Sequence, residues 1–318
     1  MSMINEVRES VLAIVNKNNY GYISPSDFNL FAQQAQLDIF EDYFYAYNNQ
    51  LVKENIRRSG SGYADLTKGL SEVIDSFSEE AFLTRVLISN NYNLPDDYYL
   101  INKVFHYSSL LTSGTNTLNS VNKLVDNTQS FTSSLVPIGS IVVNIDSKSQ
   151  AFVTAIDSAT TLSVSTDLNL AAGKPYQIFS SKNIREVERV TQNKIFYLNN
   201  SNLTAPTNSF PAYVLGGATS TTLGNTITIY PVTINGAADI KVQYIRYPRT
   251  PQWTYVTLAN GEPVFDQSSG TYVDFELPVS DEYGLVNKIL EYAGISIREE
   301  AVYNFGKTSD DSETQQES

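Results

Sequence analysis

Residues 24–51 read SPSDFNLFAQQAQLDIFEDYFYAYNNQL, and this stretch decides the fold of the first part of the chain. Ser24 can cap a helix, Pro25 suits the first helical position, and Asp27 stands where a capping box takes an acid. The apolar residues that follow recur at helical spacing. The stretch therefore predicts one long helix from Pro25 to about Leu51.

Apolar residues fall on more than one side of this predicted helix. A helix of that kind must be covered by several neighbours, either within its own chain or in an assembly. Packing in the core of the chain is the ordinary interpretation, and contact between identical subunits is the alternative. One side carries Leu30, Leu37, Phe44 and Leu51, with Phe40 and Tyr47 between them, and the other carries Phe28, Phe31, Ala35 and Ile39.

Helices are also predicted near both ends of the chain. Residues 4–16 carry an apolar stripe at three- and four-residue spacing. Ser280 can cap a last helix over residues 281–304, which has two acids in its first turn. Short helical pieces are expected at residues 71–77 and 79–88.

The middle of the chain has the pattern of a β structure. Between Ser108 and Ser181 the sequence is rich in Ser, Thr and Asn and nearly free of charge, and turn sequences separate short apolar runs. This is typical of a small β module inserted into a larger domain. Strands are predicted at residues 99–107, 139–145, 151–156, 161–165, 176–179, 186–190, 194–198, 212–215, 226–230 and 239–247.

Composition limits the classes of function. The 318 residues have a formal net charge of −13 and a pI of about 4.5, which disfavours a protein that grips nucleic acid through Lys and Arg. An acidic surface would nevertheless suit a conduit for DNA, because it does not hold the polymer. The absence of Cys excludes disulfides and thiolate metal sites. A secretory signal pattern and a membrane-spanning apolar run are both missing, so a soluble intracellular product is expected.

Candidate catalytic groups are few. His106 is the single His, which excludes two-His metal sites and catalytic triads. The adjacent acids Glu79-Glu80 and Asp96-Asp97 are expected at turns and helix starts rather than in a catalytic pair. Gly60-Ser61-Gly62 is expected to be a loop, since its spacing to Lys68 does not match a phosphate-binding loop. We therefore expect no catalytic, cofactor-binding or metal-binding residue, and no enzymatic activity.

Five segments, in this order, resemble the head–tail adaptor proteins of podovirus-type phages, the tail tubular protein A-like family, which includes ring proteins of crAss-like phages. Each segment is short, and their order makes the resemblance fairly specific. They come from both ends of the chain and from the later sheet, regions that make up about two-thirds of the chain. They are residues 19–41, which include Tyr20-Gly21-Tyr22-Ile23-Ser24-Pro25; Leu94-Pro95-Asp96-Asp97-Tyr98-Tyr99; residues 187–207, which begin Val187-Glu188-Arg189-Val190; residues 229–253, which include Ile229-Tyr230-Pro231 and Pro251-Gln252-Trp253; and Phe275-Glu276-Leu277-Pro278.

The resemblance implies an α+β fold, in which a helical bundle from both chain termini joins an antiparallel β domain that carries the inserted module. The implied segments are 1–111 for the N-terminal helical part, 112–181 for the inserted small β module, 182–276 for the β domain, 277–306 for the C-terminal helix and 307–318 for an acidic tail expected to be disordered when free.

The resemblance further implies a structural virion protein, a closed ring of about twelve copies that joins the portal to the tail. DNA would pass through the ring without sequence-specific binding. The expected partners are identical copies, the portal protein, and other ring, tail or fibre proteins, with assembly in the host cytoplasm and no membrane. The candidate interface residues are Phe28, Phe31, Leu37, Phe40, Phe44, Tyr47, Leu285, Ile289 and Tyr292, and the candidate partner-docking residues are Trp253, Asp310 and Asp311.

Two alternatives remain open from the sequence. A tail-fibre or receptor-binding protein would fit the many Tyr residues and the Ser/Thr/Asn-rich β content, which suit carbohydrate contact. It would form a trimer, and helices at both chain ends fit it poorly. An enzyme that degrades surface polysaccharide is the other alternative, and it would turn over its substrate.

Overall fold

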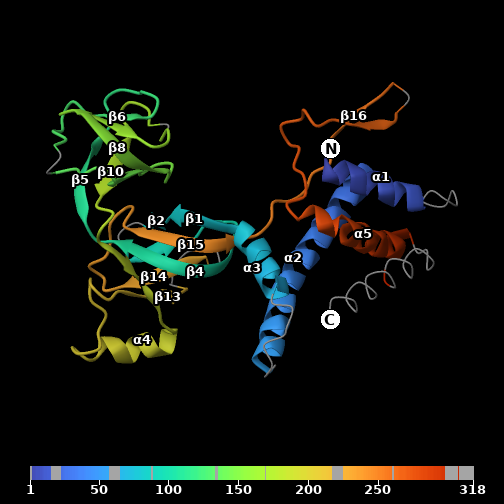
Figure 1. The fold of residues 1–318 in the computed structure, drawn as a ribbon, viewed down its shortest axis with the longest axis horizontal. Coiled ribbons are helices and arrows are strands. Elements are labelled where there is room, and N and C mark those ends of the chain that lie inside the picture. The colour runs from blue at the N-terminus through green and yellow to red at the C-terminus, as the bar shows by residue number, and fades with distance from the viewer. Residues whose placement is uncertain are drawn as a thin grey trace. The chain divides into compact units, whose positions relative to one another are not determined.

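The computed structural model describes residues 2–15, 23–56, 65–86, 89–132, 135–168, 170–216, 225–259, 261–297 and 307. The chain forms two compact units (Figure 1). The helical unit takes residues 1–77 and 247–318, and the β unit takes Ser78–Arg246. The expected α+β fold class, with helices from both chain ends and antiparallel sheets between them, is confirmed.

The helical unit is built from segments far apart in the sequence. Helix α2 contacts both α3 and α5, and α1 packs on α5. The predicted helix at residues 25–51 is present and continues to Ile56. The helices are α1 (Met3–Val15), α2 (Pro25–Ile56), α3 (Asp65–Ser76), the short 3-10 helix η2 (Val279–Asp281) and α5 (Glu282–Ile297).

The predicted cap at the start of α2 is confirmed. The backbone N–H of Asp27 donates to the Ser24 hydroxyl oxygen at 3.1 Å, and this hydroxyl donates to the Asp27 carboxylate at 2.6 Å. Helix α1 obtains its cap from a distant segment instead. The N–H groups of Met3 and Ile4 donate to the Asp274 carboxylate at 3.1 and 2.8 Å. Because an acid is favourable at a helix N-terminus, Asp274 ties the two ends of the chain together.

A β-hairpin belongs to the helical unit as well. Its strands β16 (Tyr255–Thr257) and β17 (Pro263–Phe265) pair antiparallel. Residues 247–276 were expected in the β domain, and the structure instead groups them with the helices. The cause is visible in the packing, since Asp274 of this segment bonds to α1 and Trp253 bonds to α2.

The β unit contains two sheets that share one core. In the described residues, the first sheet has the order β1-β15-β4-β11 and the second has the order β12-β13-β14-β3-β2. Neighbouring strands are antiparallel except for the parallel pair β12–β13. Buried residues of both sheets form the core, among them Val104, Val242, Tyr92 and Ile229. The strands are β1 (Ser78–Phe82), β2 (Thr84–Arg85), β3 (Asn91–Asn93), β4 (Tyr98–Tyr107), β11 (Ile184–Glu186), β12 (Glu188–Arg189), β13 (Ala212–Leu215), β14 (Thr226–Tyr230) and β15 (Ile240–Arg246).

Two local predictions in this unit are wrong. Residues 79–88, expected to be helical, contain β1 and β2, because β1 pairs with β15 in the first sheet. Residues 194–198, expected to be a strand, lie in helix α4 (Gln192–Asn199). Short apolar runs of this kind do not distinguish a strand from a helix by periodicity. Here Ile195 packs on Ala212 and Val214 of β13, so one face of the short helix is buried.

The inserted module is a single antiparallel sheet with the strand order β5-β10-β7-β8-β9-β6 in the described residues. It begins at Leu110, close to the predicted start at residue 112, and the four strands predicted between residues 139 and 179 are present as β7 to β10. Its base packs on the rest of the unit through Phe179 and Ile141, which cluster with Phe82 and Tyr107. The strands are β5 (Leu110–Thr115), β6 (Lys123–Val125), β7 (Ile141–Asn144), β8 (Gln150–Ser158), β9 (Thr161–Val164) and β10 (Pro175–Phe179).

Candidate functional site

Four of the nine predicted interface residues lie in the interior of the helical unit. Phe28 is 1% exposed, and Phe40, Leu285 and Ile289 are fully buried. The Phe40 ring makes an edge contact with Phe77 at 5.1 Å between ring centres. These four side chains are covered by their own chain and cannot reach a neighbouring copy in this conformation. This corrects the predicted interface in favour of the ordinary interpretation, core packing.

The other five predicted interface residues lie at the border of that core. Phe31, Leu37, Phe44, Tyr47 and Tyr292 are each half-buried. The Phe44 ring contacts Phe40 at 5.2 Å, and the Tyr292 hydroxyl donates a hydrogen bond to the carboxylate of Asp38. Each therefore shows only part of its side chain to solvent, so this set offers a smaller apolar surface than the sequence indicates.

Trp253 is a structural anchor of the helical unit. It is 1% exposed, and its indole N–H donates to the side-chain oxygen of Asn5 in α1 at 3.0 Å. Its backbone N–H donates to the side-chain oxygen of Asn29 in α2 at 2.9 Å, and the Asn29 amide donates back to the Trp253 carbonyl at 3.2 Å. The sequence left two roles open for Trp253, an anchor for a partner or a residue of the core. The structure corrects the partner-docking role and favours the core, because nearly all of the Trp253 surface is used within the chain. Asp310 and Asp311, the other docking candidates, lie outside the described residues.

Several of the titratable groups named in the sequence analysis are buried or paired with other side chains of the chain. His106 is 6% exposed in β4, and burial lowers its pKa. Glu79 pairs with Arg246 at 2.7 Å, and Asp97 accepts a hydrogen bond from the Tyr244 hydroxyl at 3.0 Å. Across the described ranges, no group of three or more His, Cys, Asp or Glu side chains is placed to hold a metal ion. Residues 60–62 fall outside those ranges.

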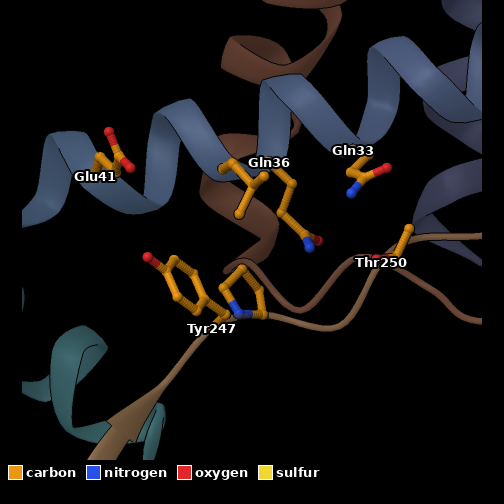
Figure 2. Close-up of a pocket in the computed structure, with 7 residues that line it drawn as sticks. Gln33, Gln36, Glu41, Tyr247 and Thr250 are labelled. Atoms are coloured by element: carbon orange, nitrogen blue, oxygen red, sulfur yellow. The ribbon is translucent and has the colours of Figure 1, made fainter. Parts of the chain in front are cut away.

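A pocket of about 390 Å³ lies within the helical unit, between α2 and the segment that follows residue 246. Gln36 points from α2 toward that segment (Figure 2). Its side-chain amide donates to the Arg249 carbonyl at 2.8 Å, and its oxygen accepts the Glu276 N–H at 3.1 Å. Gln36 thus joins the segment to α2 through both polar atoms of its side chain. We therefore interpret the pocket as a space left where the segment packs on the helix. Its lining is Gln33, Gln36, Leu37, Glu41, Tyr247, Pro248 and Thr250.

Five exposed apolar side chains lie on or near α4 in the β unit, including the two most exposed large apolar residues of the described chain. The rings of Phe196 and Tyr197 touch edge to face at 5.9 Å, and Leu203 and Phe210 are 94% and 82% exposed. Thr204 donates to the Leu198 carbonyl at 3.3 Å, which folds the following loop back onto the helix. Thr233 donates to the side chain of Asn208 at 2.8 Å, which brings a second loop alongside. We call this surface the α4 patch; its members are Phe196, Tyr197, Leu203, Phe210 and Val232.

A second exposed apolar surface lies on the inserted sheet. Backbone hydrogen bonds connect the segments that carry it: Val164 to Asn122 at 2.9 Å, Ser165 to Phe152 at 2.9 Å and Gly139 to Val153 at 2.8 Å. The exposed side chains next to these bonds therefore lie in one region of the sheet. We call this surface the module patch; its members are Val121, Ile138 and Phe152, all at least half exposed.

The net charge of the chain belongs entirely to the helical unit. This unit contains 10 Lys and Arg against 23 Asp and Glu, a net charge of −13. The β unit contains 11 Lys and Arg against 11 Asp and Glu, a net charge of zero. The chain therefore consists of an acidic helical unit and a β unit with no net charge.

Comparison with known proteins identifies no relative of this chain. No protein-family model matches the sequence, and a search of curated proteins finds no match. In the described part of the chain, every helix falls short of the length and apolar character that a membrane span requires.

Proposed function

We propose that this chain is a structural virion protein, a subunit of the connector ring that joins the portal of a short-tailed bacteriophage to its tail. The observation that carries the proposal is the charge division, with a net charge of −13 in the helical unit and zero in the β unit. A ring multiplies the charge of each subunit by the number of copies. If the helical units border the central channel, they present a strongly negative wall to DNA.

Such a wall suits the passage of DNA. A protein that holds DNA neutralises phosphates with Lys and Arg, and the affinity grows with the number of such contacts. A wall of the same sign as the polymer makes few of these contacts, so the polymer slides past it. The proposed channel therefore guides DNA without sequence-specific binding, and the neutral β unit is free to contact proteins.

The fold class supports the same proposal. A helical unit from both chain ends, with a β unit between them that carries an inserted sheet, is the organisation that the resemblance to phage adaptor proteins implies. Because one fold can serve many functions, the fold alone would not carry the proposal. The proposed partners are identical copies, the portal protein and neighbouring tail proteins, and the proposed location is the collar of the virion.

Mass measurement and electron microscopy test the proposal. Native mass spectrometry of the purified chain should give a closed assembly of about twelve copies. A chain that is monomeric alone should still appear in the collar of the virion, because the portal can template the ring. A stable trimer, or a chain located on the fibres, would contradict the connector role. Turnover of a surface polysaccharide by the purified chain would contradict the proposal that it is not an enzyme.

One observation favours the tail-fibre or receptor-binding alternative. The α4 patch presents three exposed aromatic rings, Phe196 and Tyr197 on α4 and Phe210 on the following loop, which is rich in Asn, Thr and Ser. Aromatic faces beside uncharged hydrogen-bonding groups suit sugar rings. Binding of the purified chain to host surface glycans, lost in a Tyr197→Ala and Phe210→Ala variant, would support this alternative over the connector.

A further inference from the structure

The β unit contains a stretch of basic side chains that its own acids do not pair with. Of its 11 Lys and Arg residues, five form ion pairs with acids of the same unit. Two more, Arg85 and Lys148, donate to backbone carbonyls. The remaining four are exposed and make no ion pair and no side-chain hydrogen bond among the described residues. All four lie within residues 182–194: Lys182, Arg185, Arg189 and Lys194.

We call residues 182–194 the basic edge. Two acids lie in this stretch. Glu186 pairs with Lys103 at 3.4 Å, whereas Glu188 is exposed and has no ion pair among the described residues. Residues 195–238, which follow the stretch, contain no charged side chain. The basic edge therefore carries an excess of positive charge within a unit that has no net charge.

The same residues form an edge of both core sheets. In the described strand orders, β11 is the last strand of the first sheet and β12 is the first strand of the second. Every residue of these two strands is exposed. Between them, Val187 is 3% exposed in the shared core, and its N–H donates to the Val104 carbonyl at 2.8 Å. Val187 therefore fixes the backbone, while the charged side chains before and after it face solvent.

Strand β11 has an open outer side. In an antiparallel pair, successive residues direct their N–H and C=O groups alternately toward and away from the neighbouring strand. Val187 and Asn183 bond toward β4 and its end, since the Ser108 N–H donates to the Asn183 carbonyl at 3.4 Å. The alternation therefore directs the backbone groups of Ile184 and Glu186 to the open edge. An edge of this kind can pair with a further extended strand.

We propose that the basic edge binds an extended acidic segment of another protein, which adds a strand beside β11. Backbone hydrogen bonds to Ile184 and Glu186 give the contact its geometry, and the four unpaired cations select a segment rich in Asp and Glu. The inference assigns a protein contact to the neutral β unit. It goes beyond the connector role and does not depend on it.

Charge and geometry favour this occupant over the other anionic ones. DNA is held through many phosphate contacts, and the helical unit, with its net charge of −13, repels it. The helices of a second copy use their backbone groups internally, so they cannot extend a sheet. Residues 308–318 of this chain are acidic but contain no apolar residue, which makes them poor strand formers.

A fluorescent peptide of alternating Glu and Thr is the probe, and fluorescence anisotropy with the full chain measures its binding. A peptide with Gln in place of Glu should bind at least about tenfold more weakly. Lys182→Gln with Lys194→Gln should weaken binding of the acidic peptide by about three- to tenfold. The matched control, Lys123→Gln with Lys174→Gln, removes two exposed lysines that already pair with acids, and should change the affinity by less than about twofold. Circular dichroism checks that each variant is folded.

Hydrogen exchange distinguishes strand addition from a purely ionic contact. The bound peptide should slow the exchange of the Ile184 and Glu186 amide protons. Binding without this protection, or equal losses in the two lysine variants, would overturn the inference. No binding would overturn it as well, because the cations would then only keep the edge from pairing with other strands.

Two further outcomes would assign the edge to a different occupant and so overturn the proposal. One is tighter binding to single- or double-stranded DNA than to the acidic peptide. The other is peptide binding that appears only after residues 308–318 are removed, which would assign the edge to the chain's own acidic end. The connector role fails separately, if microscopy places the chain outside the collar.

Discussion

The guanidinium carbon of Arg8 lies 3.8 Å from the centre of the Trp253 ring. Arg8 belongs to α1, and Trp253 belongs to the segment that leads into α5, so the stacking joins the two ends of the chain. Asn5 strengthens the junction by accepting the indole N–H. A cation over an aromatic face is most favourable when both groups are shielded from water, and both are buried here. These contacts join α1 to the segment that precedes α5 within the helical unit.

Replacement of this tryptophan tests that junction. Trp253→Ala should lower the free energy of unfolding by about 3–5 kcal/mol, because it leaves a large cavity and removes the ring that Arg8 covers. Urea unfolding followed by circular dichroism measures the change. Leu258→Ala, at a residue 48% exposed in the hairpin, is the control and should change stability by less than about 0.5 kcal/mol. Equal losses in the two variants would show that Trp253 is not an anchor.

The inserted sheet should respond to acid through Asp126. Burial acts to raise the pKa of this carboxyl, but hydrogen bonds from Thr128 and Tyr176 outweigh it and hold the pKa below the ordinary value of 3.8. The Tyr176 hydroxyl donates at 2.7 Å. Because the folded pKa is depressed, the stabilisation is present above the unfolded pKa and is lost as the pH falls through the folded pKa.

Asp126→Asn should therefore be less stable than the wild type at neutral pH, by about 1.5–3 kcal/mol, since it loses charge-assisted hydrogen bonds. The difference in melting temperature between the two proteins should narrow as the pH falls from about 6 to about 3. Thermal melting at several pH values measures it. A difference that stays constant over this range would mean that folding does not lower the pKa of Asp126.

A buried amide in α5 offers a stabilising substitution. Asn287 is 1% exposed, and neither polar atom of its side chain has a hydrogen-bond partner among the described residues. Asn287→Leu should raise the free energy of unfolding by about 1–3 kcal/mol, because it removes the cost of burying these atoms. Asn144→Leu is the matched control at a buried Asn whose amide donates to Leu168 at 3.2 Å, and it should destabilise. Destabilisation by both changes would show that Asn287 has a polar partner.

Assembly should strengthen as salt screens the helical units from one another. Raising the ionic strength from about 0.01 M to about 1 M shortens the Debye length from about 30 Å to about 3 Å. The association constant, measured by sedimentation, should rise over this range. Salt-induced dissociation would instead indicate that opposite charges hold the copies together.

Matched variants locate the source of that salt effect. Replacing the exposed helical-unit acids Glu9, Glu41 and Asp75 with their amides should reduce the salt dependence. The same change at Asp96, Asp167 and Glu188, which are exposed in the neutral β unit, should leave it nearly unchanged. Equal effects of the two triple variants would contradict the assignment of the repulsion to the helical unit.

The helices and strands that were predicted correctly from the sequence have a clear local pattern. The cap at Ser24 and the helical spacing after it predicted α2, and turn sequences separated the strands β7 to β10. Predictions failed where a short apolar run allows either structure, as in α4, where packing on β13 decided for a helix. The placement of residues 247–276 with the helices also escaped prediction, because it depends on long-range contacts of Trp253 and Asp274.

The prediction that buried residues of the terminal helices form the interface was wrong for a related reason. Periodicity shows which face of a helix is apolar, but it does not show which chain covers that face. For Phe28, Phe40 and Ile289 the cover comes from the same chain. The α4 and module patches lie mostly on loops and sheet ends, which have no periodicity to detect. Their one sequence signal is the long charge-free run, residues 196–238 for the α4 patch, and only the structure shows that apolar side chains protrude from it.

The location of the chain in the phage particle tests the central claim most directly. Electron microscopy of the virion, at a resolution that recognises helices, should find the chain as a ring of about twelve copies between portal and tail, with the helical units facing the channel. A ring with the neutral β units facing the channel would contradict the role assigned to the charge division. Density for the chain on the fibres, or anywhere outside the collar, would contradict the connector function itself.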